Sequence, residues 1–172
     1  MEYNDIYDKN RHRTGNVHLR GTPWQSGEYG LVVCVWVTDG KGHILLTRRA
    51  KGKSFAGTWE NSGGAALAGE DSLTAICREL REETGIHAKA EDFVFLRSVR
   101  DRSTFYDHYC LTWCGDLKDI TLLPGETDAV RWATFAEVHQ LIDTGKICAI
   151  IAKQFLEEEP SLLARQTAQD FP

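Results

Sequence analysis

The stretch GGAALAGEDSLTAICRELREETGI, which runs from Gly63 to Ile86, decides the fold of this chain. Its apolar residues recur with the period of an α-helix and predict a helix over residues 72–84. A Gly-Gly pair precedes this helix and is expected to form a loop, while Gly85 stands where a helix C-cap glycine belongs. Acidic residues just before the helix favour its positive N-terminal end. The stretch therefore predicts a glycine-rich loop that leads directly into a capped helix.

Three glutamates lie on one side of the predicted helix, next to its apolar stripe. Because a helix advances by about 100° per residue, Glu79, Glu82 and Glu83 fall within an arc of roughly 100°, with Glu83 closest to the apolar edge. Arg78 is four residues before Glu82 and can brace it. Two carboxylates about 4 Å apart at a partly buried site repel by about 4 kcal/mol at an effective dielectric constant of 20. A solvated helix face would leave this repulsion to water, whereas a hard cation would turn it into binding.

The composition argues against several classes of protein. With 20 basic and 25 acidic residues the formal net charge is −5, which argues against a broad nucleic-acid-binding surface. No apolar run approaches the ~20 residues of a membrane helix, and the polar N-terminus lacks a signal-peptide core. The cysteines form no CxxC pair, so a zinc site is not expected. Four of them have apolar neighbours and are expected to be small buried residues in a reducing, cytoplasmic environment: Cys34, Cys77, Cys110 and Cys148.

The length of 172 residues predicts a single domain over 1–172, without repeats or an internal linker. Within it, residues 1–27 are expected to form an N-terminal extension of two short strands, and 160–172 a loosely held tail. Strands are predicted at 31–37, 43–47, 59–61, 93–99, 105–114 and 128–134, and further helices at 135–143 and 147–158. The nearly unbroken apolar run at 31–37 is typical of a strand buried on both faces. The fold class is therefore α/β (α+β), a central sheet with helices packed on it.

The stretch also resembles the signature of the Nudix hydrolases. That signature is glycine, five residues, glutamate, seven residues, Arg-Glu-apolar, one residue, Glu-Glu, one residue and Gly-apolar. The matching positions are Gly64, Glu70, Arg78-Glu79-Leu80, Glu82-Glu83 and Gly85-Ile86. We call this matching stretch, from Gly64 to Ile86, the box. Outside the box, Trp59 and the pair Glu126 and Trp132 extend the resemblance over roughly 28–140. It implies the Nudix-type α/β/α sandwich around a mixed β-sheet.

The resemblance also implies an activity and a set of site residues. Nudix enzymes cleave a diphosphate linkage, so the implied function is Mg²⁺-dependent hydrolysis of a phosphoanhydride in a nucleoside-diphosphate-linked or related small molecule, with Mn²⁺ as a substitute. The implied metal ligands are Gly64 through its carbonyl, Glu79, Glu82 and Glu83, with Arg78 orienting the glutamates. The general base stays open between Glu83 and Glu126, and Glu70 is expected to be structural. Dimers are common in the family, so a homodimer is one expectation for the assembly.

Further candidates and other functions remain open. Arg48 and Arg49 end a predicted strand near the expected cleft and could bind phosphate oxygens, although a solvated strand end is the more ordinary interpretation. The chain is also similar to the branch that includes isopentenyl diphosphate isomerase. That enzyme has a cysteine soon after a Trp-x-Asn-Ser segment, whereas here Trp59-Glu60-Asn61-Ser62 is followed by Gly63-Gly64. A Nudix domain that binds a nucleotide or metabolite without turnover is the third alternative.

Overall fold

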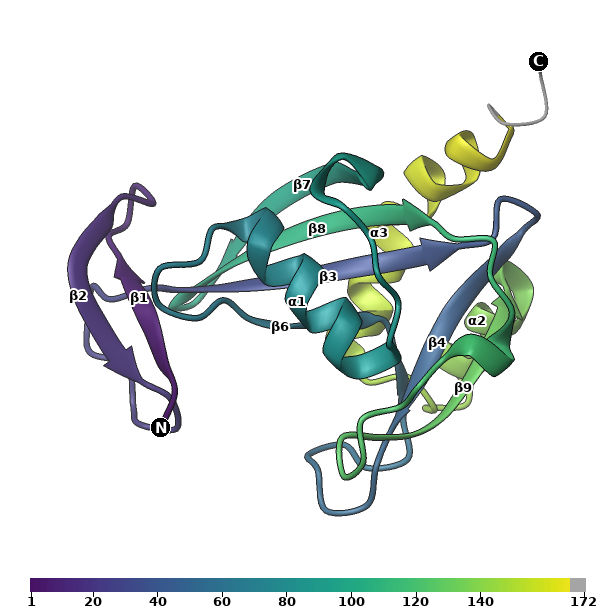
Figure 1. The fold of residues 1–172 in the computed structure, drawn as a ribbon, viewed down its shortest axis with the longest axis horizontal. Coiled ribbons are helices and arrows are strands. Elements are labelled where there is room, and N and C mark those ends of the chain that lie inside the picture. Colours follow the sequence, from purple (N-terminus) through teal and green to yellow (C-terminus); the bar gives the residue numbers. More distant parts are fainter. Residues whose placement is uncertain (168–172) are drawn as a thin grey trace.

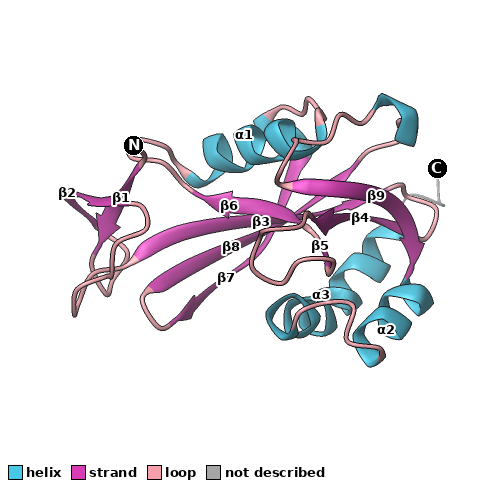
Figure 2. Cartoon of the chain, turned by 90° about the horizontal axis from the view of Figure 1, so that it is seen from below, coloured by secondary structure: helices cyan, strands magenta, loops and turns pink. Residues whose placement is uncertain are grey.

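The computed structural model describes residues 1–167 and has a mixed sheet with helices on both faces (Figures 1 and 2). The strands are β1 (Tyr3–Tyr7), β2 (Arg13–Leu19), β3 (Gly30–Thr38), β4 (His43–Arg49), β5 (Trp59–Glu60), β6 (Ser62–Ala65), β7 (Phe93–Asp101), β8 (Thr104–Thr112) and β9 (Thr127–Thr134). The helices are α1 (Ser72–Thr84), α2 (Phe135–Asp143) and α3 (Ala149–Thr167), with short 3₁₀ turns η1 (Ala90–Asp92) and η2 (Leu117–Asp119). This arrangement confirms the predicted fold class. No helix within residues 1–167 is long and apolar enough to cross a membrane.

The seven-stranded sheet is built around β3. It has the order β5-β4-β3-β8-β7, with β6 also paired to β3 and β9 to β4. Strand β8 runs parallel to β3 along its whole length, from Gly30 opposite Thr104 to Thr38 opposite Thr112. Strand β4, in contrast, meets β3 only where Thr38 faces Ile44, and β6 pairs with the preceding part of β3. The sheet therefore opens between β4 and β6, and Figure 1 shows β4 and β9 turning away from β3.

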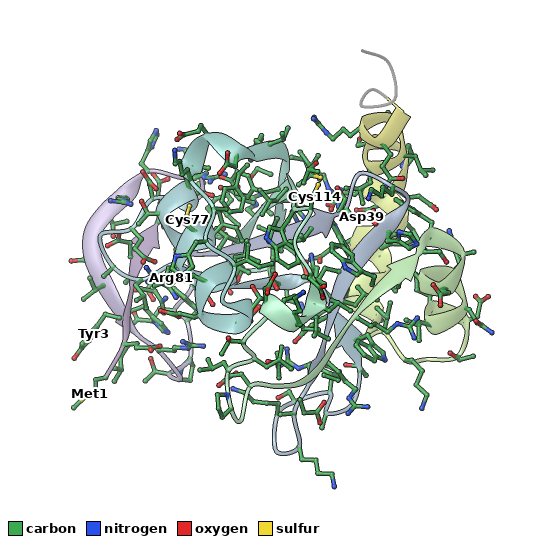
Figure 3. The ribbon with its side chains drawn as sticks, turned by 45° about the vertical axis from the view of Figure 1, so that its right-hand side comes forward. Met1, Tyr3, Asp39, Cys77, Arg81 and Cys114 are labelled. Atoms are coloured by element: carbon green, nitrogen blue, oxygen red, sulfur yellow. The ribbon has the colours of Figure 1, made fainter. Side chains whose placement is uncertain are left out.

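Helix α1 covers one face of the sheet (Figure 2). Its buried residues Ala75, Ile76 and Leu80 belong to a core cluster with Val33 and Val35 of β3. Side chains fill the space between these two layers (Figure 3). Both ends of α1 are capped, since the Asp71 carboxylate accepts the backbone N–H of Thr74 and Gly85 adopts a left-handed φ of 73°. The predicted bounds and the C-cap glycine are thus confirmed.

Helix α3 covers the opposite face and is anchored by a buried carboxylate. Glu158 accepts hydrogen bonds from the Trp36 indole and from Arg97, both at 2.6 Å, and contacts Nδ1 of His108 at 2.7 Å. Burial alone would raise the pKa of Glu158, but these partners outweigh it and hold the pKa below its usual value. Around this group Trp36, Phe155 and Leu162 form the second core cluster.

The N-terminal hairpin is attached through a second buried carboxylate. The expected pair of short strands within 1–27 is present as β1 and β2. From the turn between them, Arg11 binds both carboxylate oxygens of Asp107 on β8, one of them at 2.7 Å. Ser72, the first residue of α1, donates to the same carboxylate at 2.6 Å. Asp107 thereby connects the hairpin, the sheet and the start of α1.

The structure corrects the sequence analysis at three points. The Gly-Gly pair is not in a loop but in β6, where Gly63 lies opposite Cys34 and Gly64 opposite Val33. The helix predicted to end at 158 continues through Pro160 to Thr167, so 160–167 is not a loosely held tail. The fully buried Leu162 explains this, because its packing offsets the hydrogen bond that a proline removes. Residues 168–172 of the predicted tail lie outside the described residues.

The third correction concerns the cysteines. Cys34 and Cys110 are buried as predicted, but Cys77 and Cys148 are only partly buried. Cys114 is exposed, and its thiol contacts the Asp39 carbonyl oxygen at 3.8 Å (Figure 3). All five cysteines are free thiols.

Replacing Asp107 by asparagine should destabilise the fold by about 2 kcal/mol at pH 7, because the partly exposed Arg11 loses its buried partner. Burial alone would raise the pKa of Asp107, but the bonds from Arg11, Ser72 and Ser98 lower it below the reference value of 3.8. A lowered folded-state pKa contributes stability above the unfolded-state pKa, and this contribution is lost as the pH falls through the folded-state pKa. Urea unfolding between pH 7 and pH 2 measures this, with the exposed Asp143→Asn as the control. A difference that stays constant over this range would contradict the assignment.

Candidate active site

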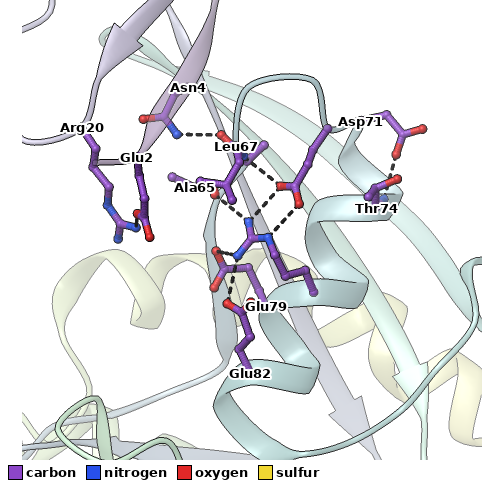
Figure 4. A network of polar contacts seen from close by, with 12 residues as sticks. Glu2, Asn4, Arg20, Ala65, Leu67, Asp71, Thr74, Glu79 and Glu82 are labelled. Atoms are coloured by element: carbon purple, nitrogen blue, oxygen red, sulfur yellow. Dashed lines mark hydrogen bonds and ion pairs between the residues drawn. The ribbon is translucent and has the colours of Figure 1, made fainter.

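Arg78 of α1 is the centre of a network that joins α1 to β6. Figure 4 shows Ala65, Glu79 and Glu82 as members of this network. Its guanidinium binds Glu70 through two bonds of 2.7 and 2.9 Å. It also donates to Glu79 at 2.9 Å, to Glu82 at 3.1 Å and to the carbonyl of Ala65 at 3.1 Å. The hydrogen bonds that Arg78 donates to Glu70 are the main reason why the pKa of Arg78 is raised, so the guanidinium stays charged although its side chain is only 15% exposed.

The same network lowers the pKa of Glu70. Burial would raise the pKa of Glu70, but Arg78 and the backbone N–H of Leu67 lower it below the usual value. Glu70 therefore holds the loop before α1 to Arg78, in agreement with the structural role expected for it.

The two glycines of β6 are required by close contacts on different sides. A Cβ on Gly64 would lie 2.4 Å from the carboxyl carbon of Glu79. A Cβ on Gly63 would lie 2.2 Å from the carbonyl oxygen of Val33 in β3. Gly63 also donates its N–H to Glu83 at 3.2 Å. The absence of a side chain at Gly64 thus leaves room for the Glu79 carboxylate, and its absence at Gly63 lets β6 pair closely with β3.

Glu83 is the most strongly perturbed carboxyl group of the box. Burial, together with the negative charges of Glu79 and Glu60, raises its pKa to about 8. Burial also raises the pKa of Glu79, although Arg78 opposes the shift. In contrast to these two residues, Glu82 is open to solvent, with a side chain that is 45% exposed. Glu83 is thus the buried glutamate, as its predicted position closest to the apolar edge implies, while Glu79 lies beside Gly64 and Glu82 lies at the rim.

The acidic cluster offers the donor set of a magnesium site without a finished cage. Among residues 1–167, no group of three or more His, Cys, Asp or Glu side chains is arranged so that it could hold a metal ion. Glu79 and Glu82 are bound to Arg78 instead. Mg²⁺ is usually held by a few carboxylates, several waters and substrate phosphates. The residues present fit that demand, because mutually repelling, partly buried carboxylates lie beside a glycine that leaves room for one of them.

Of the remaining predicted site residues, Arg49 lines a cavity, whereas Arg48 and Glu126 do not. Arg49 pairs with Glu60 at 2.6 Å and lines a cavity beside β6. Arg48 points elsewhere along the strand, since it binds Asp128 at 2.6 Å and does not line this cavity. Glu126 forms an ion pair with Lys53, and its side chain is 44% exposed.

The cavity is lined by residues that the sequence analysis did not predict to be site residues. Its volume is about 310 Å³, and it lies where β3, β8, α3 and the chain from β4 to β6 meet. Glu60 belongs to it, and burial raises the pKa of Glu60 despite the neighbouring Arg49. The lining also includes Cys34, Asn61, Tyr106 and Gln154. Only Glu60 and Asn61 carried a signal in the sequence, namely their position directly before the box.

Two larger recesses, of about 540 and 530 Å³, lie elsewhere on the protein. Neither is lined by Glu79, Glu82 or Glu83. These glutamates do not line the cavity of about 310 Å³ either, but that cavity adjoins the acidic cluster through Glu60, whose charge acts on Glu83, and through Gly63, whose N–H binds Glu83.

Comparisons with known proteins agree with this arrangement. The NUDIX domain model matches residues 28–151. An uncharacterised Nudix hydrolase of Listeria monocytogenes is 33% identical over 148 residues, which cover 85% of this chain and 88% of that protein. An isopentenyl-diphosphate Delta-isomerase of Corynebacterium diphtheriae is 30% identical over 128 residues, which cover 67% of each chain.

The fold is also found in a solved structure. The crystal structure of DR0079 from Deinococcus radiodurans superimposes with a TM-score of 0.75 and 22% identity, covering 91% of this chain and 98% of that one. The matched domain, the complete box and the relatives together identify the chain: it belongs to the Nudix family and is a Nudix hydrolase acting on pyrophosphate bonds.

Proposed function

We propose that this protein is a Mg²⁺-dependent hydrolase of a phosphoanhydride bond in a small molecule built on a nucleoside diphosphate. The observation that carries the proposal is the group of carboxylates on α1 packed against a glycine strand, where burial, followed by the charges of neighbouring carboxylates, raises the pKa of Glu79 and Glu83. Such a group is costly by itself and becomes favourable next to a divalent cation. Glu79, Glu82, Glu83 and the carbonyl of Gly64 would hold the ion. When bound, it would neutralise the diphosphate and make water more acidic.

The residues of the chain would contribute positioning and proton transfer. Arg78 keeps Glu79 and Glu82 oriented through its bonds to both. A water molecule attacks one phosphorus atom, the bond from that phosphorus to the bridging oxygen breaks, and two phosphate-containing products leave. A carboxylate takes the proton of the attacking water as general base. Glu83 and Glu126 are the candidates for this role. Glu60 joins them, because it is buried beside the cavity and interacts electrostatically with both.

Arg49 is the better of the two arginine candidates for contact with phosphate oxygens. It lines the cavity and binds the Glu60 carboxylate there. Arginine binds phosphate oxygens through the same kind of charge-assisted N–H···O bond. Arg48 is bound to Asp128 outside the cavity.

Glu82→Gln and Glu83→Gln should each lower kcat/KM by about 100-fold or more, because each removes a charge needed for cation binding or proton transfer. Phosphate release from a panel of nucleoside diphosphate derivatives measures the rate. The exposed Glu91→Gln serves as the control and should keep full activity. Conversion of isopentenyl diphosphate to its isomer, without hydrolysis of any anhydride, would instead support the isomerase alternative. Ligand binding with no turnover of the panel would support a binding domain.

Removal of divalent ions by EDTA should abolish hydrolysis, and Mg²⁺ should restore it, with Mn²⁺ as a working substitute. Mg²⁺ should also raise the Tm, because a ligand that binds only the folded state stabilises it. This shift should disappear in the Glu79→Gln/Glu82→Gln double variant. Equal Tm shifts in the wild type and the double variant would place cation binding somewhere else.

The two glycines should respond differently to alanine. Gly63→Ala forces a Cβ onto the Val33 carbonyl and should lower the Tm strongly, since two paired backbones must separate. The three atoms nearest to a Cβ on Gly64 all belong to the Glu79 side chain, so the main effect of Gly64→Ala should be a loss of activity of about tenfold or more with a smaller change in Tm. Thermal unfolding and kcat/KM of both variants test this. The reverse ranking of the two Tm values would contradict the packing described here.

A further inference from the structure

The cavity beside β6 has the surface of a binding pocket for a ring. Tyr106 of β8 and Phe55 of the loop 50–58 line it, together with Ile150 and Ile151 of α3. Phe55 is 61% exposed and Ile150 is 56% exposed. Large apolar side chains left open to solvent around a cavity of about 310 Å³ are the usual lining of a small-molecule pocket.

Two amide side chains in this lining each have one buried atom without a hydrogen-bond partner. Asn61, between β5 and β6, is 5% exposed, and its Nδ2 has no partner. Gln154 of α3 is 8% exposed, and its Oε1 has no partner. A buried polar atom is normally paired, and an unpaired one is costly. Either orientation of these amides offers both a donor and an acceptor.

One end of the cavity borders the acidic cluster. Glu60 and Gly63 line the cavity, and both act on Glu83, the former by its charge and the latter through its backbone N–H. Arg49 lies at the same end, paired to Glu60 at 2.6 Å. A diphosphate held at the cluster would therefore leave its attached group next to the cavity.

We propose that this cavity binds the base of a nucleoside diphosphate and that Asn61 and Gln154 determine specificity by hydrogen-bonding its edge. The inference rests on the proposed function and adds where the substrate is recognised. An alkyl group would leave both amides unpaired, whereas a base supplies donors, acceptors and a flat face for Phe55 and Tyr106. The two amides come from segments far apart in the sequence, which only the fold brings to one cavity.

Calorimetric titration in Mg²⁺ tests the proposal without requiring turnover. The probes are ADP, GDP, CDP, UDP, isopentenyl diphosphate and inorganic pyrophosphate, which shares the anion but has no base. At least one nucleoside diphosphate should bind the wild type tenfold or more tightly than pyrophosphate does. Asn61→Leu and Gln154→Met should each weaken that binding by tenfold or more and leave pyrophosphate binding unchanged. Gln140→Met, on the exposed face of α2, is the matched control and should change neither.

The folding of the variants provides a second readout. Because the amide atoms are unpaired in the free protein, replacing them by apolar groups of similar shape should leave the Tm unchanged or raise it. A lower Tm with equal weakening for all probes would overturn the proposal and make the amides structural. Nucleoside diphosphates that bind no better than pyrophosphate would also overturn it, as would isopentenyl diphosphate binding most tightly. Base-selective binding without hydrolysis would support this inference while refuting the proposed catalytic function.

Discussion

The hydrogen bonds of Arg78 are the interaction on which the site depends. Five bonds use all five N–H groups of the guanidinium: two to Glu70 and one each to Glu79, Glu82 and the Ala65 carbonyl. They join the loop before α1, the helix itself and β6 through a single planar group. A lysine could not replace it, because an ammonium has three donors and no fixed fork. The same bonds make it possible to bury several carboxylates at the interface of α1 and β6 without leaving all of them unpaired.

The sequence was sufficient wherever the structure is determined locally. The bounds of α1 follow from its apolar period, and Gly85 has the left-handed φ that its position predicted. The burial of Glu83 at the edge of the apolar stripe also follows from helix geometry. The Gly63-Gly64 pair was misread because glycine usually disfavours strands. Its place in β6 depends on contacts with β3 and Glu79, which no local pattern contains.

Nonlocal packing explains the remaining differences. Pro160 ordinarily ends a helix, yet Leu162 beyond it is buried against the sheet. Asp107 and His108 are neighbours in sequence but point to opposite faces of β8, where Asp107 binds Arg11 and His108 contacts Glu158. They are therefore parts of two separate anchors. Gln154 had no recognisable signal, because its environment exists only once α3 packs on the sheet.

The divergence of β4 from β3 explains why the acidic cluster and the cavity adjoin. After the contact of Thr38 with Ile44, β4 leaves the edge of β3, and β6 takes its place. Gly63 then serves two sides of the sheet: its N–H reaches Glu83 of α1, and its backbone borders the cavity next to α3. The box can be recognised from one contiguous stretch, whereas the cavity is assembled from β3, β8, α3 and the segment before β6. Relatives that share the box can therefore cleave the same kind of bond while differing in the group that they recognise.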